Sequence, residues 1–264
     1  AFNKLRTTDD LPEVIYAREY DAAISPNGNI PVHAFNLISP TFFANSSTGN
    51  KYSLWVNVYG VSERYLNVYG EKDLRAQMNQ FFHRTYTHPV DGTTLDMKML
   101  CNWYWYDETA ILETGKGTKD WNFYRYAETL LSAAEAIAQS SGVNAEAAGY
   151  LAQVKARANM EGKDVSTIAS ELQRLGKQAF IEECWKERLR EFPLEMKIWD
   201  DCVRTGKFPQ ISATNKGEVQ FVDLIGAKNG SGATFKATDL YWPIPVNEIQ
   251  RNPNLTQNEG YSAK

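Results

Sequence analysis

The pattern of apolar and polar positions is clearest in the middle of the chain, where it predicts two helices. Apolar side chains recur from Phe123 to Ile137 at the three- and four-residue spacing of one helix face. A second stripe runs over residues 147–158, and the polar segment 140–144, which contains a glycine, separates the two. We therefore predict a helical hairpin over about residues 122–160. Its alanine-rich faces allow close approach, as in tetratricopeptide-type repeats, although the chain shows only one such pair.

The same periodicity predicts three more helices, over residues 71–83, 166–192 and 194–204. Pro193 lies between the last two, where it ends one helix or kinks it. Arg188 falls on the apolar stripe of the long helix, so its guanidinium needs a carboxylate or carbonyl partner. We expect Glu195 or Asp201 to supply it. This corner is then a buried polar network that fixes two helices, not a ligand site.

Two segments are predicted to be extended. The side chains of residues 98–106 alternate in the two-residue period of a strand. Trp103 and Trp105 would lie on one face and two tyrosines on the other. The tail reads Y-W-P-I-P from Tyr241, and proline neither continues a helix nor donates an amide hydrogen. We expect an ordered tail whose rings and Ile244 pack inward.

Composition and charge limit the class of function. The 264 residues carry a net charge of -4, which argues against a broad basic surface for nucleic acid or anionic lipid. No apolar run reaches the 18 residues that a membrane span needs. The three cysteines are far apart and lack CxxC or Cys/His spacing, so we expect buried free thiols rather than zinc or a disulfide framework.

Sequence motifs of catalysis are absent. The chain contains no GxSxG, P-loop, GxGxxG or HExxH. His83 and His88 lie five residues apart across a predicted helix end, a poor spacing for metal ligands. Glutamates are dense over residues 182–191, but the spacing of Glu187 and Glu191 is that of ordinary charges on a helix surface. We therefore expect no enzyme, no metal and no cofactor, although a pair of carboxylates for glycoside hydrolysis cannot be nominated or dismissed from sequence.

Three longer motifs follow one another along the chain. Residues 122–136 read N-F-Y-R-Y-A-E-T-L-L-S-A-A-E-A, residues 187–206 begin E-R-L-R-E-F, and residues 242–261 run from W-P-I-P to Q-N-E-G-Y. A short D-L-R lies at residues 73–75. In this order they resemble the motifs of the SusD/RagB family, non-catalytic nutrient-binding lipoproteins of the Bacteroidetes outer membrane. The resemblance spans nearly the whole chain.

The chain departs from the family's usual pattern at a few positions. Leu189, Met196 and Ile198 stand where arginine, glycine and arginine are usual. Pro193 is a further departure, and Glu259 replaces the usual proline of the tail. The first four fall in the predicted polar network, so they bear on that network rather than on membership of the family.

The resemblance implies a mainly α fold, a fragment of a tetratricopeptide-like α-α superhelix with long loops and small β elements. Family members are usually longer, so residues 1–264 would be one carboxy-terminal domain. The amino-terminal half, with most repeats and the lipid-anchoring cysteine, would be absent. Such proteins lie at the cell surface, attached to the outer membrane only through that lipid. They bind glycans and deliver them to a TonB-dependent, SusC-like transporter.

The family has no fixed ligand motif, so candidate ligand residues follow from chemistry alone. Sugars pack their C–H faces on aromatic rings and bond to amides and guanidinium groups. Six residues in and after a polar loop offer these groups: Asn50, Tyr52, Trp55, Asn57, Tyr59 and Arg64. Trp55 either meets the ligand or faces the core from a strand. Two alternatives remain, the same fold binding peptides or another nutrient, and a glycoside hydrolase.

Overall fold

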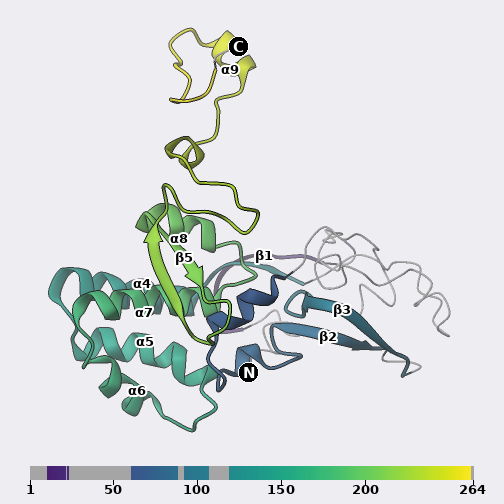
Figure 1. Cartoon of the computed structure of the whole chain (residues 1–264), viewed down its shortest axis with the longest axis vertical. Coiled ribbons are helices and arrows are strands. Elements are labelled where there is room, and N and C mark those ends of the chain that lie inside the picture. The colour runs from purple at the N-terminus through teal and green to yellow at the C-terminus, as the bar shows by residue number, and fades with distance from the viewer. Residues whose placement is uncertain (1–10, 22, 24–60, 89–91, 107–118, 263–264) are drawn as a thin grey trace. The chain divides into compact units, whose positions relative to one another are not determined.

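A computed structural model describes residues 11–21, 23, 61–88, 92–106 and 119–262 of the chain (Figure 1). The chain divides into two compact units. The first comprises Ala1–Lys197 with Ile211–Val219, and the second comprises Ile198–Gln210 with Gln220–Lys264. Within the described residues, no helix is both long enough and apolar enough to span a lipid bilayer.

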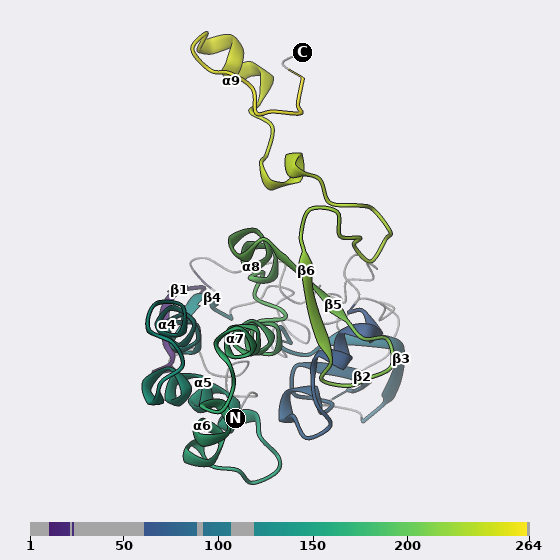
Figure 2. The same cartoon turned by 60° about the vertical axis from the view of Figure 1, so that its left-hand side comes forward.

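Four helices build the core of the first unit: α4 (Tyr126–Ser141), α5 (Ala145–Ala158), α6 (Val165–Leu172) and α7 (Lys177–Glu191). Helix α4 packs against both α5 and α7, and α5 packs against α6. Figure 2 shows α4, α5 and α7 nearly end-on. Buried alanines on the facing surfaces of α4 and α5, among them Ala134 and Ala148, leave room for close packing. The side chain of Asn144 caps α5 by accepting from the amide of Ala147 at 2.9 Å.

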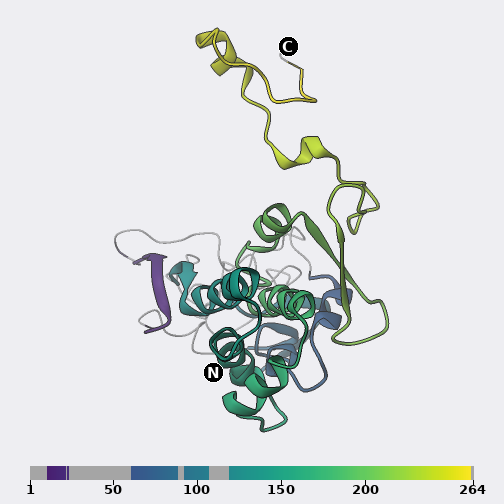
Figure 3. The same cartoon turned by 90° about the vertical axis from the view of Figure 1, so that its left-hand side faces the viewer.

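The described part of the first unit also contains two small antiparallel sheets. Strand β1 (Val14–Arg18) pairs with β4 (Trp121–Arg125), and β2 (Phe82–Thr87) pairs with β3 (Thr94–Asn102). Because β4 runs directly into α4, the first sheet lies at the amino-terminal end of that helix (Figure 3). Two 3-10 helices precede β2, η1 (Glu63–Val68) and η2 (Leu74–Ala76).

The second unit has few buried residues. It contains α8 (Ile198–Thr205), most of the paired strands β5 (Lys207–Ile211) and β6 (Val219–Asp223), η4 (Ala237–Leu240) and α9 (Val246–Arg251). The ring of Phe235 lies 5.6 Å from that of Trp199 and 5.2 Å from that of Phe208. The described residues therefore form a mixed, mostly helical fold with small two-stranded sheets.

Several predicted elements are wrong in extent or kind. Residues 71–83 form η2 and the start of β2 instead of a helix, because strand pairing places Phe82 opposite Asn102. The long helix predicted over 166–192 is two helices, α6 and α7, separated at Gly176. The predicted hairpin begins four residues late, since residues 121–125 belong to β4.

Two predictions about aromatic residues also fail. Strand β3 ends at Asn102, so Trp103 and Trp105 do not alternate along a strand. In the tail, Trp242 is 88% exposed and Tyr241 is exposed as well, whereas both were expected to pack inward. The tail is held by local hydrogen bonds instead. Gln257 brackets Ile244, accepting from its amide at 2.8 Å and donating to its carbonyl at 2.9 Å.

Candidate functional site

Residues far apart in sequence meet in a buried group of ion pairs beside α7. The guanidinium of Arg75 donates to Glu187 at 2.7 Å and to Glu191 at 2.9 Å. Asp73, two residues before it, accepts from the same guanidinium at 2.7 and 2.9 Å. The short D-L-R motif is therefore bound to the glutamates of the long E-R-L-R-E-F motif.

The R-Y-A-E motif joins the same group through its arginine. Arg125, which is fully buried, donates to Glu195 through two nitrogens at 2.6 and 3.0 Å and to Glu191 at 3.1 Å. Its guanidinium also bonds to Glu13 beside β1. We call the set Asp73, Arg75, Arg125, Glu187, Glu191 and Glu195 the ion network.

The ion network changes the proton affinity of its buried glutamates. Burial alone raises the pKa of Glu187, but Arg75, Lys155 and Arg190 outweigh it and lower the pKa to about 2. For Glu195 burial prevails over the attraction of Arg125, and its pKa is raised. Glu187 is therefore ionised at pH 7. For Glu195, burial shifts the equilibrium towards the protonated, uncharged form.

The sequence located this network and its carboxylate Glu195, but did not identify the arginine that Glu195 binds. Arg188 donates to Glu128 of α4 at 3.0 Å, and Glu195, one of its two expected partners, accepts from Arg125 at 2.6 Å. Glu187 and Glu191 are fully buried, so their assignment to a helix surface was also wrong. The error arose because the partners, including Arg75, come from segments that periodicity alone does not bring together.

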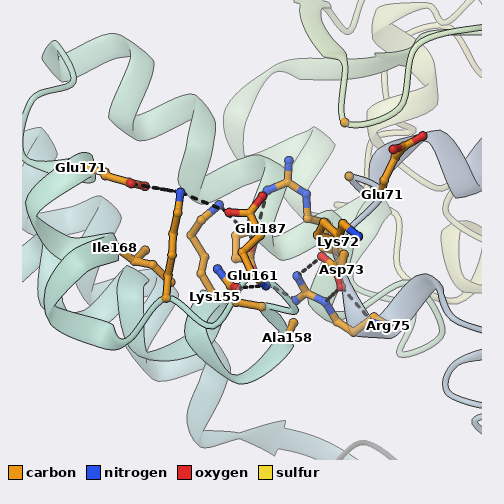
Figure 4. Close-up of a pocket in the computed structure, with 15 residues that line it drawn as sticks. Glu71, Lys72, Asp73, Arg75, Lys155, Ala158, Glu161, Ile168, Glu171 and Glu187 are labelled. Carbon is orange, nitrogen blue, oxygen red and sulfur yellow. Dashed lines mark hydrogen bonds and ion pairs between the residues drawn. The ribbon is translucent and has the colours of Figure 1, made fainter.

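A polar pocket of about 450 Å³ opens above part of the ion network (Figure 4). Arg75 and Glu187 line it, together with residues from the segment 70–73, the end of α5, α6 and α7. Five acidic and five basic residues are among its described lining residues, and none of these carries an aromatic ring. At its edge Lys163 forms ion pairs with Glu161 at 3.2 Å and Glu171 at 3.0 Å.

A second feature lies on the β1–β4 sheet, where three aromatic side chains are exposed. Tyr16 is 59%, Phe123 40% and Tyr124 54% exposed. The ring of Tyr16 lies 5.5 Å from that of Phe123 and 6.4 Å from that of Tyr124, with planes inclined by 27° and 29°. The ammonium of Lys197 lies 4.5 Å from the centre of the Tyr124 ring. We call these four residues the ring shelf.

Sequence reasoning missed the ring shelf for an identifiable reason. The helical spacing places Phe123 on a buried stripe, but β4 ends only at Arg125 and leaves Phe123 outside the helix. Tyr16 comes from the other end of the described chain and is joined to Tyr124 by strand pairing. The alternation of β4 is too short, at five residues, to have predicted this pairing.

Of the predicted ligand residues, only Arg64 can be placed, and it is exposed on η1. The other five lie outside the described residues: Asn50, Tyr52, Trp55, Asn57 and Tyr59. Trp105 belongs to the core, where its indole donates to the carbonyl of Leu194 at 3.0 Å. All three cysteines are buried free thiols, as predicted. The described residues contain no group of side chains suited to a metal ion.

Comparison with known proteins identifies the family. The model of the SusD family matches residues 44–261. The chain belongs to the SusD family. A curated relative, the starch-binding protein SusD of Bacteroides thetaiotaomicron, is 36% identical over 138 residues, which are 52% of this chain and 21% of that protein.

Solved structures agree with this membership. A SusD superfamily protein from Parabacteroides distasonis has a TM-score of 0.79 and 27% identity, over 98% of this chain and 53% of that one. Surface glycan-binding protein A of B. thetaiotaomicron, solved in complex with laminarihexaose, shares the fold with a TM-score of 0.65 and 18% identity, over 97% and 54% of the two chains. The chain thus spans about half the length of these structures.

Proposed function

We propose that this SusD-family chain is the carboxy-terminal domain of a non-catalytic, surface-exposed glycan-binding protein of the outer membrane. The longer protein, tethered by a lipid on its other half, would deliver oligosaccharides to a TonB-dependent, SusC-like transporter. The helical hairpin of α4 and α5 would then be one pair of a tetratricopeptide-like superhelix. The observation that carries the proposal is the family match over residues 44–261. The starch-binding and laminarihexaose-bound relatives support glycans as the ligand class.

The buried carboxylates support a binding role over a hydrolytic one. A glycoside hydrolase needs two carboxyl groups that face the same sugar across an open cleft. Glu187 and Glu191 are instead fully buried and paired with Arg75, so neither is free to transfer a proton to a sugar. These two glutamates therefore stabilise the packing of the first unit.

The test is glycan binding by the full-length protein. We expect retardation in native gels that contain starch or laminarin, and no release of reducing sugar after long incubation. Within the proposed site, the Trp55→Ala variant should lose retardation while Trp105→Phe, altered in the core, keeps it. Tyr52, Tyr59, Asn50, Asn57 and Arg64 are the next positions to test. Failure of the wild-type protein to bind any glycan in a broad panel would overturn the proposal, and released sugar would revive the hydrolase.

The polar pocket of Figure 4 favours the alternative of a peptide ligand. Its described lining residues carry both signs of charge and no ring, which suits the ammonium and carboxylate of a short peptide better than a sugar face. In particular, the paired Lys163 and Glu171 at its edge can each exchange partners with such a ligand. The peptide alternative would be supported if the protein binds di- and tripeptides, if Lys163→Ala weakens that binding, and if no glycan in the panel binds.

A further inference from the structure

We propose that the ring shelf, formed by Tyr16, Phe123, Tyr124 and Lys197, is a platform on which a chain of glucopyranose units lies. The inference rests on the glycan-binding function proposed above and adds candidate ligand residues other than those nominated from the sequence. A ring shelf of this kind differs from scattered surface aromatics, because the rings of Phe123 and Tyr124 on β4 lie within 6.4 Å of the ring of Tyr16 on the paired strand β1.

The chemistry of the shelf suits a sugar with all hydroxyls equatorial. Such a ring presents axial C–H groups on both faces, and these pack against the face of an aromatic ring, while its hydroxyls point sideways. The phenol groups of Tyr16 and Tyr124 and the ammonium of Lys197 are hydrogen-bond donors at or beside the rings. Glucose therefore fits the shelf better than a sugar with an axial hydroxyl on the stacked face.

The shelf is held in place before any ligand arrives. The ammonium of Lys197 donates to the carbonyl of Phe123 at 2.6 Å and pairs with Glu128 at 3.0 Å. Glu128 in turn accepts from Arg188 of α7 at 3.0 Å. One face of the Tyr124 ring is thus fixed by a cation that is tied to two core helices. A preorganised platform loses little conformational entropy on binding.

The experiment is calorimetric titration of the full-length protein with maltoheptaose and with laminarihexaose. We expect Tyr124→Ala and Tyr16→Ala each to weaken binding of at least one glucan by about tenfold or more. Tyr124→Phe keeps the ring and should bind nearly as the wild type does. Lys197 is a positioning residue, so Lys197→Ala should weaken binding and Lys197→Arg should restore it. Tyr241→Ala, which removes an exposed tyrosine of the other unit, is the matched control.

The outcomes separate the shelf from the broader function. Wild-type affinity in Tyr16→Ala and Tyr124→Ala, with loss of binding in Trp55→Ala, would overturn the shelf and leave glycan binding intact. No binding of either glucan by the wild-type protein would overturn the shelf, while a hit elsewhere in the glycan panel would still uphold the proposed function. If a ring variant does not fold, the shelf is tested instead by measuring nitration of the tyrosines in the wild-type protein. Bound glucan should then protect Tyr16 and Tyr124, and equal nitration with and without it would refute the shelf.

Discussion

The ion network of the first unit and the tail of the second both consist of family motifs rich in polar residues, yet they use them in opposite ways. The network joins residues more than 60 positions apart, such as Arg125 and Glu191, and both of these side chains are fully buried. The tail joins residues within about 20 positions and leaves them accessible, as where Asn258 donates to the carbonyl of Trp242 at 2.7 Å. The tail departs from the family's pattern at Glu259 alone, whereas the segment 187–206 departs at four positions, so a well-matched motif need not be a buried one.

The two kinds of motif stabilise different parts of the molecule. A buried charge is costly unless its partner is present. Arg125 directly precedes α4 and binds Glu191 at the end of α7, so neither helix end can move without leaving a buried charge unpaired. The hydrogen bonds of the tail replace water at the backbone around two prolines and so fix a local shape. Loss of a partner should therefore destabilise the whole first unit in one case and a short segment in the other.

The largest effect is expected from Arg125→Met. The substitution leaves Glu191 and Glu195 buried with one cation fewer, and breaking such a pair costs about 3–5 kcal/mol of unfolding free energy. Urea unfolding measures it. The control is Arg84→Ala, which breaks an exposed pair with Glu63 and should cost under about 1 kcal/mol. Equal losses in the two variants would show that the network is not energetically special.

The second largest effect is expected from acid, which should destabilise the ion network. The pKa of Glu187 is lowered from 4.5 to about 2 in the folded state, so its contribution is complete above about pH 4.5 and is lost as pH falls through about 2. That shift corresponds to about 3 kcal/mol. Glu195 has the opposite sign: its raised pKa gives a contribution that is lost as pH rises through the folded value. Unfolding free energies at pH 2–6 should fall with acid, and less so in Glu187→Gln; parallel profiles would contradict the assignment.

The same comparison shows what the sequence could and could not predict. Local periodicity correctly indicated helices in the regions of α4, α5 and α7, because each buries one continuous face. Periodicity failed at Phe82, because pairing of β2 with β3 overrides the helical spacing there. In the tail, the prolines correctly predicted extended backbone, but nothing local determines whether Trp242 is covered.

The candidate sites show the same limit more strongly. A ring-bearing loop is visible in sequence, whereas the ring shelf requires Tyr16 and Tyr124 to be paired across more than 100 residues. Likewise, Arg188 was correctly expected to need a carboxylate, but the choice of Glu128 depends on how α4 packs on α7. Chemistry thus predicts which groups need partners, and only the fold selects them.

A smaller and local effect is expected in the tail from Gln257→Ala. The variant removes both hydrogen bonds to Ile244, which together contribute on the order of 1–2 kcal/mol to the local structure. Hydrogen exchange at the Ile244 amide should therefore accelerate by about tenfold. Gln250→Ala, at an exposed glutamine of α9, is the control and should leave exchange at Ile244 unchanged. A drop in the unfolding free energy of the first unit would show that the tail is not a local motif.

The smallest effect on stability is expected from substitution of Met196, an exposed residue directly after the buried Glu195. Its φ of 58° lies in the left-handed region, which costs an L-residue about 1–2 kcal/mol, and its side chain is 68% exposed. Glycine, the family's usual residue here, avoids that strain but adds freedom to the unfolded chain. Met196→Gly should therefore raise the unfolding free energy by about 0.5–1 kcal/mol. Met160→Gly, at an exposed methionine outside the left-handed region, should lower it. If both substitutions destabilise equally, the side chain of Met196 has packing partners that offset its strain.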